Sequence, residues 1–148
     1  MRGDLTEMEI ATALMRAGMT VLRPLSSAGR YDLVIDAGGG VFTRVQCKTG
    51  VLRKGRILFR VCSADARQPL GVSYEGQADA FGVYCPQLAN AYLVPMAAVS
   101  GLGIVASLRV EASRNRQIKR VRYAHDYEIR PPSTASDSLY SGREGSMR

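Results

Sequence analysis

Residues 31–50 read YDLVIDAGGGVFTRVQCKTG, and this stretch decides the fold. Its first part alternates, with Leu33 and Ile35 on one face and Asp32 on the other. Three glycines at 38–40 predict a turn, and residues 41–48 predict a second strand after it. We therefore expect a hairpin that ends at Thr49-Gly50.

The second strand of this hairpin carries a polar face. Gln46 and Lys48 share that face, while Cys47 points to the apolar side, because side chains alternate along a strand. Folding the hairpin would bring Asp32 to the same end of the sheet, so an acid, an amide and an amine converge. Lysine is scarce, with 3 among the 20 basic residues. A lysine here suggests a role for a compact ammonium, although a lysine that merely ends a strand is the alternative.

A helix is expected from Asp4 to Ala17, with Asp4 as its cap and Gly18 closing it. A helical wheel places Glu7 within the apolar arc, and a carboxylate there must be paired, protonated or bound to a cation. The spacing of Asp4 and Glu7 equally fits a capping box. The apolar arc is formed by Leu5, Met8, Ile10, Ala11, Leu14, Met15 and Met19.

The rest of the chain predicts more strands than helices, which gives an α/β or α+β protein built on a mixed sheet. We expect one domain over residues 1–130 and a disordered polar tail over 131–148. Residues 104–129 remain ambiguous. The pattern predicts strands at 21–23, 56–61, 80–84 and 91–94, a turn at 54–55, a loop or short helix over 63–77 and a helical turn at 95–100.

Charge and composition narrow the classes of function. The net charge is +7, and the excess gathers in residues 44–67 and 109–122. Segregated positive charge is typical of a polyanion binder, with a merely soluble basic surface as the equal alternative. One histidine and three widely spaced cysteines argue against a zinc site and indicate reduced thiols. With no apolar run near the ~20 residues of a membrane helix and no signal core, we expect a cytoplasmic protein without membrane contact.

Taken together, Glu7, the strand 31–36 and the strand 45–50 resemble the PD-(D/E)xK nuclease superfamily. The nearest likeness is to the group I intron homing endonucleases that carry QxK in place of (D/E)xK, and archaeal Holliday-junction resolvases share the same layout. The resemblance implies an αβββαβ core with a central mixed β-sheet flanked by helices. Two departures stand out. The Pro-Asp dipeptide of the family is absent, because Arg30-Tyr31 precede Asp32, and Gln46 stands in place of the motif acid. Similar residues continue at 54–57, 74–76, 79–81, 83–86, 92–95, 108–109, 115–117 and 124–128.

This resemblance implies a Mg²⁺-dependent DNA endonuclease, with Mn²⁺ able to substitute. Asp32 would be a direct metal ligand, the main-chain carbonyl of Cys47 a second, and Glu7 would bind through water or complete a weaker site. Lys48 would hold or help deprotonate the attacking water and steady the transition state. Gln46 could ligate the metal through its amide oxygen, more weakly than a carboxylate.

The implied partner is double-stranded DNA, cut by a homodimer or homotetramer. A Holliday-junction resolvase, a restriction-type nuclease and a catalytically inactive DNA-binding module are the alternatives. RNA processing is weaker, because the sequence holds no aromatic stacking motif for single strands. The expected DNA-binding residues are Arg53, Lys54, Arg56, Arg67, Arg114, Arg116, Lys119 and Arg120.

Overall fold

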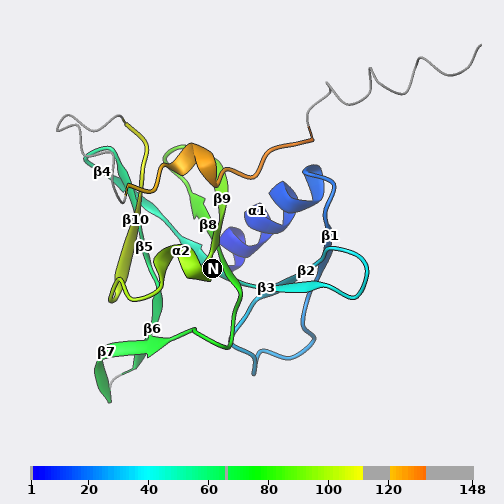
Figure 1. Cartoon of the computed structure of the whole chain (residues 1–148), viewed down its shortest axis with the longest axis horizontal. Helices are drawn as coiled ribbons and strands as arrows, with labels where there is room; N and C mark the ends of the chain where they lie inside the picture. The colour runs from blue at the N-terminus through cyan, green and yellow to red at the C-terminus, as the bar shows by residue number, and fades with distance from the viewer. Residues whose placement is uncertain (1, 66, 112–120, 133–148) are drawn as a thin grey trace, which may run out of the picture.

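The computed structural model describes residues 2–65, 67–111 and 121–132, and it combines a long helix with ten strands over those residues (Figure 1). In chain order the elements are α1 (Arg2–Arg16), β1 (Thr20–Leu22), β2 (Leu33–Asp36), β3 (Phe42–Thr49), β4 (Val51–Arg53), β5 (Arg56–Arg60), β6 (Cys62–Asp65), β7 (Gln68–Ser73), β8 (Ala80–Cys85), β9 (Asn90–Pro95), α2 (Met96–Val99), β10 (Val105–Arg109) and a 3-10 turn at Ala124–Asp126.

The central sheet is mixed and has the strand order β1-β2-β3-β8-β9. Only β3 and β8 run parallel, whereas the other neighbours are antiparallel. The predicted hairpin is present as β2 and β3, with Leu33 opposite Val45 and Asp36 opposite Phe42. The mixed α+β architecture expected from the sequence is thus confirmed, although the strands β4 to β7 stand where the expected αβββαβ order has a helix between β3 and β8.

Two hydrophobic clusters lie on opposite faces of the central sheet. On one face α1 packs through Ile10 and Leu14 onto Val45 and its neighbours. On the other face the sheet β10-β5-β4 contributes Phe59, which meets Phe81 of β8 edge to face. The helix comes close because β8 has Gly82 where it crosses; a Cβ there would lie 2.8 Å from Cγ2 of Ile10. This packing fixes where α1, and hence Glu7, stands relative to the sheet.

The buried face of α1 differs from the expected apolar arc. Leu5, Met8 and Met15 are exposed by 63%, 62% and 56% of their surface, while the helix buries Thr6, Ile10 and Leu14. A buried threonine is tolerated because its hydroxyl shares a 2.6 Å hydrogen bond with that of Thr49 on β3. The helix also begins at Arg2, so Asp4 lies inside its first turn rather than at its cap, and the capping-box interpretation is wrong.

Residues 63–77 were expected to form a loop or short helix, which is wrong for most of their length. They contain the antiparallel pair β6 and β7, with a register shift between Ser63 and Asp65. Gly71 makes this pairing possible because it has a φ of +75° and a Cβ would lie 2.8 Å from the carbonyl oxygen of Ser63. In Figure 1 this hairpin projects at the lower left.

Three further expectations concern residues 104–129, the predicted tail and membrane-spanning helices. The ambiguous stretch 104–129 contains β10, which pairs with β5. Most of the predicted tail, from residue 133 onward, lies outside the described residues. Within the described part of the chain, no helix combines the length and apolar character needed to cross a bilayer.

Candidate active site

A cleft of about 360 Å³ opens between α1, the segment 23–31 and the beginning of β2. Glu7 and Asp32 both line it, together with Arg23 and Tyr31. The helix presents Glu7 from one side, and the hairpin presents Asp32 from the other. Two residues 25 positions apart in sequence therefore face the same cleft.

Asp32 is held rigidly at the end of the hairpin. Its backbone N–H donates to the carbonyl of Val45 at 2.8 Å, and its Oδ2 accepts from the backbone N–H of Cys47 at 2.7 Å. Burial raises the pKa of Asp32, against the opposing effects of the Cys47 N–H and the charges of Lys48 and Arg23. β3 thus orients the carboxylate, and the nearby positive charges do not fully offset the effect of burial on its pKa.

Glu7 is the second acid of the cleft. Its side chain is 25% exposed, and its Oε2 lies 3.4 Å from Nη2 of Arg23. Burial, followed by the negative charge of Asp32, raises the pKa of Glu7, while Arg23 acts in the opposite direction. Two neighbouring carboxylates repel each other when both are charged, and a bound cation relieves that repulsion.

The motif strand β3 supplies the remaining predicted groups. Lys48 Nζ donates to the hydroxyl of Tyr74 at 2.9 Å and lies 4.7 Å from the centre of its ring. Gln46 Nε2 lies 3.5 Å from the carbonyl oxygen of Cys47, so that amide and that carbonyl are neighbours. The thiol of Cys47 is buried, which raises its pKa and leaves it as a core group.

The donor set favours a hard cation. The set predicted from the sequence consists of the carboxylates of Glu7 and Asp32, which line the cleft, with the Cys47 carbonyl and the Gln46 amide. These are oxygen ligands of the kind that Mg²⁺ takes, and Mg²⁺ needs only one or two carboxylates because it retains water. Among the described residues there is no group of three or more His, Cys, Asp or Glu side chains that could hold a metal.

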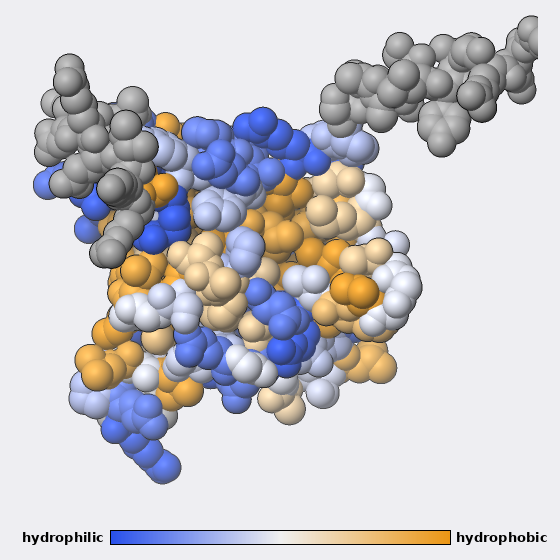
Figure 2. Space-filling model, in the orientation of Figure 1, coloured by the Kyte–Doolittle hydropathy of each residue, from blue (hydrophilic) through white to orange (hydrophobic). Residues whose placement is uncertain are grey.

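Some of the predicted DNA-binding residues form a row across the second sheet. Arg53 pairs with Arg56 across β4 and β5, and Arg56 pairs with Arg109 across β5 and β10. Arg53, Lys54 and Arg56 are exposed, and so is Arg67 beside β7, where the space-filling view is hydrophilic (Figure 2, lower left). The four others, Arg114, Arg116, Lys119 and Arg120, lie outside the described residues.

The row of Arg53, Arg56 and Arg109 is not at the cleft that Glu7 and Asp32 line. The turn between β4 and β5 stands at the end of β5 opposite to β6, and in Figure 1 it lies at the upper left while β6 and β7 lie at the lower left. The cleft belongs to the other end, because Arg30, two residues before Asp32, is bonded to Ser63 and Val72 of β6 and β7. The arginine row and the cleft thus lie toward opposite ends of β5.

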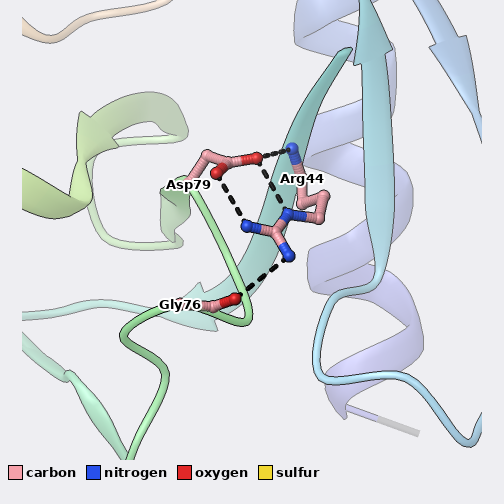
Figure 3. Close-up of polar contacts among 3 residues, drawn as sticks. All are labelled: Arg44, Gly76 and Asp79. Carbon is pink, nitrogen blue, oxygen red and sulfur yellow. Dashed lines mark hydrogen bonds and ion pairs between the residues drawn. The ribbon is translucent and has the colours of Figure 1, made fainter.

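Asp79, which carries no predicted chemistry, has a structural role (Figure 3). It accepts hydrogen bonds from the backbone N–H of Arg44 at 2.7 Å and from the guanidinium at 2.9 and 3.0 Å, while Arg44 also donates to the carbonyl of Gly76. These contacts join β3 to the start of β8. Asp36, the last residue of β2, supports the glycine turn, because its Oδ1 accepts a hydrogen bond from the N–H of Gly38 at 2.9 Å.

Sequence reasoning missed three residues around the site: Arg23, Arg30 and Tyr74. Arg23 and Arg30 lie in or beside a segment of turn composition, where no periodicity indicates the direction of a side chain. Tyr74 reaches Lys48 across 26 positions of sequence. The stretch 74–76 resembled the nuclease pattern, which was the one available signal for it.

Comparison with known proteins agrees with the sequence resemblance. A family described as PD-(D/E)XK endonuclease matches residues 1–130. Among solved structures, a bacterial homing endonuclease, I-Ssp6803I, superposes with a TM-score of 0.61 over 94% of this chain and 88% of that one, at 20% sequence identity. At this identity the likeness concerns the fold alone. A search of curated proteins finds no significant match.

Proposed function

This chain belongs to the PD-(D/E)XK endonuclease family, and we propose that it is a divalent-cation-dependent endonuclease that hydrolyses phosphodiester bonds in double-stranded DNA. The observation that carries the proposal is that Glu7 and Asp32 line one cleft. Lys48 is close enough for its positive charge to act on the pKa of Asp32, in the lowering direction. The likeness in fold to a homing endonuclease supports a sequence-specific enzyme of that type.

Three groups would hold the cation. Because Oδ2 of Asp32 is engaged by the Cys47 N–H, Oδ1 is the oxygen it would offer, together with the main-chain carbonyl of Cys47. Glu7 would bind through water or complete a second, weaker site. When bound, Mg²⁺ or Mn²⁺ would lower the pKa of a water molecule and neutralise charge on the phosphate.

Lys48 would act on the phosphate side of the same site. An ammonium carries three N–H donors, and the Tyr74 hydroxyl takes one of them. The other two can hold the attacking water and donate to the negative charge that develops in the transition state. Gln46 would orient a water or bind the cation through its amide oxygen, which is a weaker ligand than the usual acid.

The arginine row supports binding of an anionic polymer. Like charges opposite each other on neighbouring strands destabilise a sheet, yet Arg53, Arg56 and Arg109 occupy such positions. Phosphates would relieve this repulsion. We expect contacts of this kind to position the DNA without reading its sequence, and to weaken as the salt concentration rises.

Cleavage of both strands requires two sites, so we propose a homodimer or homotetramer. Its interface would include the exposed apolar side chains Leu5, Met8 and Met15 of α1 and Leu22 of β1. An apolar groove of about 170 Å³ runs between these elements. Light scattering should give at least the mass of a dimer, and Met15→Lys should yield the monomer; a monomeric wild type would contradict this assembly.

Nicking of supercoiled plasmid tests the function. With Mg²⁺ or Mn²⁺ present, the wild type should cut, and Asp32→Ala and Lys48→Ala should cut far more slowly. Asp36→Asn, at the far end of β2, is the matched control. Cleavage unaffected by the first two substitutions would refute the site. DNA binding without cleavage would favour a catalytically inactive module, and preference for four-way DNA would favour a junction resolvase.

A further inference from the structure

We propose that Tyr74 is a positioning residue for the Lys48 ammonium and that Arg30 holds Tyr74 in place. This inference rests on the proposed function, because it assigns the support of a side chain to which that function gives a chemical role. Tyr74 and Arg30 lie outside the motif, and through them the position of Lys48 depends on the hairpin of β6 and β7.

Tyr74 is fixed by packing before it meets Lys48. Only 5% of its surface is exposed, and its ring meets that of Phe81 edge to face, with centroids 5.8 Å apart and an interplanar angle of 88°. A buried tyrosine needs a partner for its hydroxyl. Lys48 supplies that partner at 2.9 Å.

The contact restrains a side chain that is otherwise flexible. A lysine has four rotatable side-chain bonds and loses much rotamer freedom when it is held in one place. Tyr74 holds Lys48 twice, through the hydroxyl and through the face of the ring 4.7 Å from Nζ. The ammonium is therefore placed before DNA arrives, which lowers the cost of aligning it with the phosphate.

Arg30 contacts the same ring, with Cζ 4.1 Å from its centre. Its guanidinium donates to the side-chain oxygens of Gln77 and Ser63, both at 2.7 Å, and to two carbonyls of β7. Because Arg30 stands two residues before Asp32, it ties the segment that leads to the metal ligand to the turn that carries Tyr74. The carboxylate and the ammonium are thus positioned by one connected set of contacts.

The kinetic test uses Tyr74→Phe, which keeps the ring and removes the hydroxyl. Tyr92→Phe is the control, because Tyr92 is 3% exposed in the same core cluster and does not contact Lys48. In single-turnover plasmid cleavage, Tyr74→Phe should slow the reaction roughly 10–100-fold, as small misplacements of catalytic groups do, with DNA affinity unchanged. Tyr92→Phe should cut at nearly the wild-type rate.

A double variant separates positioning from general damage. If Tyr74 acts through Lys48, adding Tyr74→Phe to Lys48→Ala should cause no further loss of rate. A wild-type rate for Tyr74→Phe, or a further loss in the double variant, would overturn the proposal. If Lys48→Ala itself cleaves normally, the proposed function has failed instead.

Nuclear magnetic resonance tests the contact without any cleavage. The chain has only three lysines, at positions 48, 54 and 119, so ¹³C-labelled lysine gives three side-chain signals. The ring of Tyr74 should displace one signal from the position of free lysine, and Tyr74→Phe should move that signal alone. Three undisplaced signals in the wild type would overturn the proposal.

Discussion

Gly82→Ala tests how α1 is seated on the central sheet. The added Cβ would lie 2.8 Å from Cγ2 of Ile10, 3.4 Å from its Cδ1 and 3.1 Å from Cγ1 of Val45. Neither neighbour can yield easily, because both are fully buried and branched at Cβ. The helix must therefore move away from β8, and it carries Glu7 with it.

The cost follows from overpacking a closed interface. Forcing one methyl group into a well-packed core typically costs about 1–3 kcal/mol. For a chain of this length that corresponds to a Tm lower by roughly 3–9 °C. Urea denaturation and thermal melting of the purified variant measure both quantities. Gly3→Ala is the control, because a Cβ at Gly3 meets nothing within 4 Å and should cause no loss of stability.

A double variant shows whether the clash with Ile10 is the cause. In Ile10→Ala the obstructing Cγ2 is absent, so adding Gly82→Ala should cost less than it does in the wild type, with a coupling of about 0.5–3 kcal/mol. Cleavage should fall along with stability, because the displaced helix moves Glu7 away from Asp32. A Gly82→Ala protein as stable as the wild type would refute this account of the packing.

Three further predictions concern the charges of the site and its surroundings. Gln46→Glu should lower the Mg²⁺ concentration needed for half-maximal cleavage if the amide is in the metal shell, and an unchanged requirement in a metal titration would place Gln46 outside it. Asp79→Asn should lower Tm at pH 7, because the hydrogen bonds from Arg44 lower the pKa of Asp79 in the folded protein. That stabilisation is present above the unfolded pKa of about 3.9 and is lost as the pH falls through the folded pKa. The difference in Tm between Asp79→Asn and the wild type should therefore vanish in acid. Asp32→Asn should raise the Tm of the metal-free protein at neutral pH, because burial raises the pKa of Asp32. The wild type therefore loses stability as the pH rises from the unfolded pKa of about 3.9 through the raised folded pKa. A gain in Tm that persists below pH 3 would contradict this cause.

The hairpin was predictable because its signals are local. Three glycines mark the turn, and alternation on each side then determines the register, which places Asp32 and the motif strand at one end. Once that register is fixed, Asp32, Gln46 and Lys48 must be neighbours. This part of the site needed no knowledge of the rest of the fold.

The remaining features depend on contacts between distant segments. The predicted apolar arc of α1 was right for Ile10 and Leu14 but wrong for Met8, which is exposed. The sheet instead accepts Thr6, whose hydroxyl bonds that of Thr49. The pairing of β6 with β7 depends on the conformation of Gly71, which no alternation announces. Tyr74 belongs to the same category, since nothing in the local pattern points its side chain toward Lys48.

The proposed function depends on Asp32 as a direct ligand of a divalent ion in the cleft, beside Glu7. Titrating the protein with Mn²⁺ and following the free ion by electron paramagnetic resonance tests this without any assumption about the DNA target. We expect one tightly bound Mn²⁺ in the wild type and in Asp36→Asn, and an affinity at least about 10-fold weaker in Asp32→Asn. Equal Mn²⁺ binding by Asp32→Asn and the wild type would contradict it.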